Sequence, residues 1–195
     1  LRKGMRWSDG HPYTADDILF FVEREAYEPE VGMQNSAQNL LIYRGKRAEV
    51  EKLDDLTVRI RFDAPNGLFR ERLATWRGLP FCNTPAHYLK QYHPVDGNSK
   101  VIEATMKRYG MPSRRALYFF MKDPHNTEHP RLWPWLFRAY KANPPLSFVR
   151  NPYYFAVDTH GNQLPYIDYL DVQRVAGNEI MAAKAPTGQV DFAGR

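Results

Sequence analysis

The pattern of apolar and polar residues predicts that the chain begins with an amphipathic helix. Ile18, Phe21 and Val22 recur at helical spacing, which places them on one buried face. Thr14 and Asp17 have the spacing of a capping box, in which each residue bonds the backbone of the other at a helix start. A helix is therefore expected to begin directly after Thr14.

A different period follows the helix. Val58, Ile60 and Phe62 alternate with polar residues, the pattern of a strand with one face buried and one face in water. Residues 48–53 precede it across a turn formed by two aspartates. We therefore expect a β-hairpin formed by residues 48–53 and 57–62.

The rest of the chain predicts further short elements. Helices are expected at residues 68–76, 84–94, 99–109, 113–122 and 178–184. Thr84 is the expected cap of the second, with Pro85 at its first position. Residues 123–145 are expected to be ordered loop or short helix. Strands are expected at 146–149, 167–175 and 189–192, and their order around the last helix suggests a crossover unit.

Length and composition bound the class of protein. The 195 residues suffice for one large domain or two small lobes, and 43% hydrophobic residues allow a packed core. No run of 18 apolar residues is present, and no signal peptide opens the chain. Neither end resembles a natural terminus, so we expect a piece of a longer protein.

The reactive side chains give little support to an enzyme. The single cysteine, Cys82, is expected to be buried and inert, although a catalytic thiol is the alternative. His125 and His129 have the spacing of a metal pair, but prolines flank them, and surface histidines are expected instead. The sequence contains no phosphate-binding glycine loop and no nucleophile elbow. We expect no catalytic residue, no metal and no cofactor.

Two alternative functions stay open on the residues alone. An enzyme using Cys82 or a His125/His129 site would lose turnover in a Cys82→Ala variant. A basic nucleic-acid-binding domain would use the net charge of +5 and the 14% aromatic residues, and would bind DNA in a salt-dependent way. The basic residues are scattered and form no long tract, so we expect no nucleic-acid partner.

Four segments, in order along the chain, resemble one protein family. They are the opening LRKGMRWSDGHPYTADD, the hairpin VEKLDDLTV at 50–58, the pair VRNPYYF at 149–155 and GNQLPYID at 161–168, and GQVDF at 188–192. Together they resemble the family 5 extracellular solute-binding proteins of bacterial ABC importers. The sequence departs from that pattern at Phe155, where the family usually has Trp, and residues 98–145 are less familiar.

The resemblance implies a fold and a division into domains. It implies a mixed α+β protein that is part of a periplasmic-binding-protein-like type II fold. Residues 1–148 would form a small accessory subdomain, residues 149–195 would begin the main α/β lobe, and the C-terminal lobe would be missing. Two lobes that close around a solute need a cleft and a hinge but no reaction chemistry.

The resemblance also implies a function and partners. The chain would belong to the substrate-binding component of an ABC transporter, which captures a peptide or an oligosaccharide for ABC permease subunits in the membrane. It would be periplasmic or extracellular, monomeric, and associated with the membrane through its transporter. Aromatic and cationic side chains at turns are candidates for stacking on the solute. The candidate ligand-binding residues are Trp76, Arg77, Trp133 and Trp135.

Overall fold

The computed structural model describes residues 1–31, 40–138, 146–173, 175–184 and 186–192. The α-helices are α1 (Ala15–Phe21), α3 (Phe69–Leu73), α4 (Ala86–Leu89), α5 (Ser99–Tyr109), α6 (Arg114–Met121) and α7 (Asn178–Lys184). A π-helical turn η1 (Val22–Ala26) extends α1, and 3-10 turns form η2 (Trp76–Cys82) and η3 (Lys90–Tyr92). The strands are β1 (Ile42–Tyr43), β2 (Lys46–Arg47), β3 (Glu49–Asp54), β4 (Thr57–Arg61), β5 (Trp135–Phe137), β6 (Leu146–Arg150) and β7 (Tyr169–Val172).

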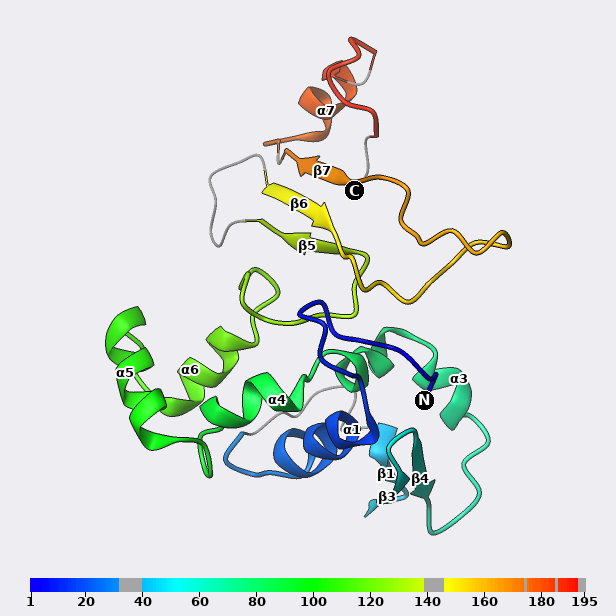
Figure 1. The fold of residues 1–195 in the computed structure, drawn as a ribbon, viewed down its shortest axis with the longest axis vertical. Coiled ribbons are helices and arrows are strands. Elements are labelled where there is room, and N and C mark those ends of the chain that lie inside the picture. The colour runs from blue at the N-terminus through cyan, green and yellow to red at the C-terminus, as the bar shows by residue number, and fades with distance from the viewer. Residues whose placement is uncertain (32–39, 139–145, 174, 185, 193–195) are drawn as a thin grey trace.

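These elements form two regions (Figure 1). Helices α1 and α3 to α6 gather with the β3–β4 hairpin at one end of the molecule, and the sheet of β5, β6 and β7 lies beyond them with α7 next to it. The capping box, the hairpin and the helices α5 and α6 confirm the sequence predictions.

Helix α1 contributes to both hydrophobic clusters of the helical region. Ile18, Phe21 and Val22 pack in one cluster, which also contains Trp7. Phe20 packs in the second cluster, with the buried residues of α4, α5 and α6. The predicted buried face of α1 is confirmed, and the helix separates the two clusters.

The start of α4 differs from the prediction. Thr84 is not its cap, because the Thr84 hydroxyl donates to the carbonyl of Pro80 at 3.0 Å. The backbone N–H of Ala86 donates instead to Oδ1 of Asp17, at 2.8 Å. The other oxygen of Asp17 accepts from the Thr14 N–H at 2.9 Å and from Trp7 Nε1 at 3.1 Å. The carboxylate of Asp17 therefore accepts a backbone N–H at the start of each of two helices, α1 and α4.

The second region is an antiparallel sheet in the order β5-β6-β7. Strand β5 lies in a stretch that was expected to be loop or short helix. No strand forms at 189–192, where the backbone is bent or irregular, and the three strands of the sheet pair antiparallel, so the predicted crossover unit is wrong. Strand β6 runs across position 148, the boundary of the expected domain division, and that division stays a prediction.

Candidate functional site

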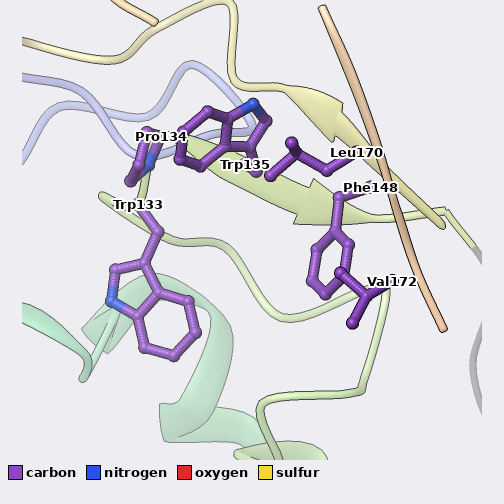
Figure 2. A pocket seen from close by; sticks show the side chains of 6 residues that line it. All are labelled: Trp133, Pro134, Trp135, Phe148, Leu170 and Val172. Atoms are coloured by element: carbon purple, nitrogen blue, oxygen red, sulfur yellow. The ribbon is translucent and has the colours of Figure 1, made fainter. Parts of the chain in front are cut away.

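An apolar cavity of about 270 Å³ lies against the three-stranded sheet (Figure 2). Its lining side chains come from all three strands and from the segment that precedes β5. They are Trp133, Pro134, Trp135, Phe148, Leu170 and Val172. Two of the four predicted ligand-binding residues, Trp133 and Trp135, therefore lie at the same cavity.

The strand register explains why this face of the sheet is apolar. Cross-strand partners project from the same face of a sheet, and successive residues alternate between faces. Phe148 pairs with Phe137 on one side and with Leu170 on the other, so all three share one face. Leu146 pairs with Val172 two positions along and adds to this face. The rings of Phe137 and Phe148 are in contact, with centroids 4.2 Å apart.

Asn151 positions the segment that supplies the two tryptophans. It has no exposed surface, and its Nδ2 donates to the Trp133 carbonyl at 2.8 Å. Its backbone N–H donates to the Pro134 carbonyl, also at 2.8 Å. The Trp135 ring is held separately, because its Nε1 donates to the Ile167 carbonyl at 3.1 Å. Backbone and ring are thus both fixed at the edge of the cavity.

Arg131 supports Trp133 from inside the protein. Its guanidinium carbon lies 4.9 Å from the centre of the Trp133 ring, within the range of a cation–π contact. Only 2% of Arg131 is exposed, and burial lowers its pKa to about 10, which leaves it charged at neutral pH. Its Nη2 donates to the carbonyl of Asp123 at 2.8 Å. A buried cation of this kind restricts the tilt of the indole ring.

The cavity is suited to binding and not to proton transfer. None of the six lining side chains carries a titratable group. Two indole rings and a phenyl ring present flat apolar surfaces, on which aromatic groups and the C–H faces of sugar rings stack. The arrangement can hold a ligand with an apolar face, but it supplies no acid, base or nucleophile.

The other predicted ligand-binding residues, Trp76 and Arg77, are not part of this cavity. Both are exposed in η2, and 66% of Trp76 is accessible to solvent. The Arg77 guanidinium carbon lies 5.6 Å from the centre of the Trp76 ring, so the two side chains contact each other. The structure therefore separates the four residues into a pair at a cavity and a pair on an open surface.

The residues of the enzyme alternative lie in different places from those expected. Cys82 is exposed, so its predicted burial is wrong, although the protein atoms around the thiol raise its pKa through desolvation. His129 is buried, contrary to the prediction that it lies on the surface, and burial lowers its pKa to about 2. His125 contacts Asp123 through Nδ1 at 2.9 Å. Among the described residues, no cluster of three His, Cys, Asp or Glu side chains could hold a metal.

Sequence reasoning missed several residues of the cavity. Phe148, Leu170 and Val172 fall in predicted strands, but only the register shows that they meet on one face. Asn151 anchors the segment before β5 to the end of β6 through its bonds to the carbonyls of Trp133 and Pro134. The signal that could have revealed the face is the alternation Leu-Ser-Phe at 146–148 and Leu-Asp-Val at 170–172.

Comparison with known proteins settles the family. The model described as "Bacterial extracellular solute-binding proteins, family 5 Middle" matches residues 1–195. The chain belongs to family 5 of the bacterial extracellular solute-binding proteins. The resemblance inferred from the four motifs is thereby confirmed.

Other members of family 5 are named for different solutes. The chain is 32% identical to a periplasmic alpha-galactoside-binding protein of Rhizobium meliloti over 190 residues, which are 91% of this chain and 24% of that protein. It is 38% identical to an oligopeptide-binding protein OppA, with a TM-score of 0.85 over 98% of this chain and 29% of that one. MelB of Agrobacterium fabrum C58, solved in complex with stachyose, is 26% identical, with a TM-score of 0.73 over 99% of this chain and 26% of that one.

These family 5 structures confirm the predicted mixed α+β fold of the periplasmic-binding-protein kind. The chain spans about a quarter to a third of the length of the relatives it matches. In the part of the chain that the structure describes, no helix is both long enough and apolar enough to cross a membrane.

Proposed function

We propose that the chain is a segment of the substrate-binding component of an ABC transporter, and that it helps to capture a peptide or oligosaccharide solute. The observation that carries the proposal is the tryptophan-lined cavity, in a chain whose whole length matches the family 5 model. Two relatives support the choice of solutes, since one is named for alpha-galactosides and the other for oligopeptides.

The proposal includes partners and a location. The complete protein would deliver its solute to ABC permease subunits, act outside the cytoplasm as a monomer, and catalyse no reaction. The cavity supports a binding role because it offers stacking surfaces without a titratable group. Nucleic acid is not proposed as a partner, because the basic residues are scattered along the chain and form no long tract.

Of the four residues predicted to contact the solute, the proposal retains Trp133 and Trp135. Trp135 presents an indole ring whose orientation is fixed by the bond to Ile167. A ring that is already oriented loses little freedom when a ligand stacks on it, so it contributes efficiently to affinity. Trp76 and Arg77 line no cavity and are treated separately below.

The test is ligand binding by the full-length protein that carries this chain. Thermal unfolding with panels of oligosaccharides and peptides should identify a stabilising solute, since a ligand that binds only the folded state raises the unfolding temperature. For that solute we expect Trp135→Ala to weaken binding about tenfold, the cost of one lost aromatic contact of about 1.4 kcal/mol.

Trp135→Phe and Trp76→Ala serve as matched controls. The first keeps a flat ring at the cavity, and the second removes an indole that lies outside it. Trp76→Ala should bind within about threefold of wild type, since it leaves the cavity intact. Trp135→Phe should lose less affinity than Trp135→Ala, since it keeps a ring at the cavity although it lacks the bond to Ile167. An affinity that is insensitive to Trp135→Ala, or a protein that no solute stabilises, would contradict the proposal.

A further inference from the structure

An exposed corner of the helical region combines apolar and basic side chains. It is formed by α3 and η2, which follow each other in the chain and pack together. We call it the α3–η2 corner. Its exposed apolar and basic residues are Leu68, Arg70, Arg72, Trp76, Arg77 and Leu79.

The backbone of this corner is tightly held. The Thr75 hydroxyl donates to the Arg72 carbonyl at 2.7 Å and accepts from the Arg77 N–H at 3.3 Å. Gly78 packs so closely against α3 that a Cβ atom there would lie 2.0 Å from the Leu73 carbonyl oxygen. The exposed side chains therefore project from a rigid turn, and not from a loose loop.

The arginines of the corner have no acidic partners among the described residues. Arg70, Arg72 and Arg77 form none of the ion pairs found in that part of the chain. On the neighbouring hairpin, by contrast, Arg59 and Arg61 are each paired with a glutamate of β3. Since Glu71 is the single acidic residue of the corner, the three arginines leave it with a net positive charge.

The corner also exposes large apolar side chains. Leu68, Trp76 and Leu79 are each more than half exposed. Tryptophan and arginine are both favoured in the headgroup region of a bilayer, where an indole ring sits at the interface and a guanidinium binds phosphate. Leucines that flank them can reach the upper part of the acyl chains.

We propose that the α3–η2 corner docks on an anionic phospholipid surface. A protein partner fits the corner less well, because a stable protein interface buries about 800 Å² on each side, and a five-residue helix followed by a seven-residue 3-10 segment offers only a small surface. Headgroups instead adapt to scattered cations. Such docking would hold the protein at the membrane and goes beyond solute capture.

The experiment is co-sedimentation of the full-length protein with lipid vesicles at about 0.1 M salt, where long-range attraction is screened. Vesicles of phosphatidylcholine alone are compared with vesicles that contain about one third phosphatidylglycerol. Binding is expected only to the anionic vesicles. The triple variant R70Q/R72Q/R77Q should bind roughly a hundredfold more weakly, at about fivefold for each arginine.

A matched variant removes the same charge elsewhere. K100Q/K107Q/R108Q changes three exposed cations of α5, so it should bind the anionic vesicles within about threefold of wild type if the corner is the site. The variant R70K/R72K/R77K keeps the charge and should also bind. Anionic vesicles should shift the tryptophan fluorescence of the wild type to the blue, and Trp76→Phe should lose most of that shift. A shift that Trp76→Phe retains in full would place another tryptophan at the membrane.

The possible results separate the explanations. If R70Q/R72Q/R77Q and K100Q/K107Q/R108Q lose vesicle affinity equally, the binding depends on net charge alone and the proposal is overturned. Absence of binding to anionic vesicles would also overturn it, as would binding to permease in detergent without binding to vesicles, which would indicate a protein partner. Solute affinity, measured in parallel by thermal stabilisation, should stay unchanged in both triples, so that this proposal and the proposed function fail independently.

Discussion

The ammonium group of Lys122 contacts the carboxylate of Glu25 inside the core, where Glu25 has no exposed surface. The same ammonium donates to the Thr84 hydroxyl at 2.9 Å, and the Tyr118 hydroxyl donates to Glu25. The ion pair thereby links the C-terminal end of α6, at Lys122, to η1, at Glu25. Both charges lie in the interior, so each depends on the other for compensation.

Removal of one charge from this pair should strongly destabilise the protein. We expect Lys122→Met to lower the free energy of unfolding by about 3–5 kcal/mol, since it leaves the Glu25 carboxylate buried and uncompensated. Urea unfolding followed by circular dichroism measures the change. Lys107→Met, on the exposed side of α5, is the control and should change stability by less than about 0.5 kcal/mol. A loss below about 1 kcal/mol for Lys122→Met would contradict this account.

His129 should make stability depend on pH. Burial, followed by the charges of Arg131 and Lys122, lowers its pKa from 6.5 to about 2 in the folded protein. The folded state therefore binds fewer protons than the unfolded state below pH 6.5, and stability falls as the pH decreases. The contribution of His129 alone should amount to about 2 kcal/mol between pH 7 and pH 5.

The measurement is urea unfolding of wild type and His129→Phe across that pH range. The variant should lose the part of the pH dependence that His129 contributes, even if its stability at pH 7 also changes. His160→Gln removes an exposed histidine and should leave the slope of wild type intact. Parallel slopes for wild type and His129→Phe would show that His129 is protonated in the folded protein.

Asp17 should contribute far more to stability than the adjacent Asp16. Asp17 is buried and accepts three hydrogen bonds, whereas Asp16 forms an exposed ion pair with Lys52. Asp17→Ala should cost at least about 3 kcal/mol, because three donors lose a charged acceptor. Asp16→Ala should cost less than about 1 kcal/mol. Thermal unfolding of the two variants compares them directly, and similar costs would rule out the shared helix start.

Loss of the Asn151 side chain should both destabilise the protein and alter the segment that carries Trp133. Its side chain donates to the Trp133 carbonyl, and its Oδ1 accepts from the Tyr153 N–H at 2.9 Å. Asn151→Ala should therefore lower the free energy of unfolding by about 2 kcal/mol. Near-ultraviolet circular dichroism should also change, since the Trp133 segment loses its anchor.

Asn162→Ala is the matched control for Asn151→Ala. It removes an exposed amide that donates to Asp158 in a surface turn, so it should cost less than about 1 kcal/mol and leave the tryptophan signals unchanged. A loss of stability in Asn151→Ala without a change in those signals would show that Asn151 does not position Trp133.

The sequence predictions succeeded where the interactions that decide the structure join residues close together in the chain, and failed where they join distant ones. The helix after Thr14 was found because the two residues of its capping box, Thr14 and Asp17, lie three positions apart, and the β3–β4 hairpin was found because its alternation and its turn are both local. Strand β5 was missed because its three residues become a strand only through pairing with β6, and a three-residue run flanked by proline carries no period of its own.

The candidate site was predicted in part for the same reason. The sequence indicated that Trp133 and Trp135 are available for stacking, but the residues that complete their cavity come from β6 and β7, up to 39 positions along the chain. Thr84 was assigned as a cap because a threonine before a proline is a strong local signal. The acceptor that actually serves Ala86 lies 69 residues away, and no local pattern reveals it.

That long-range acceptor turns one amide into a reporter. The Ala86 N–H is protected by a side chain of α1 and not by its own helix, so its hydrogen-exchange rate measures how often the two segments separate. An opening that leaves α4 intact but moves α1 away would expose this amide, while the N–H groups of Tyr88 and Leu89, which donate to the Pro85 carbonyl, stay protected. The early part of the chain can thus be monitored from a single position in the middle of it.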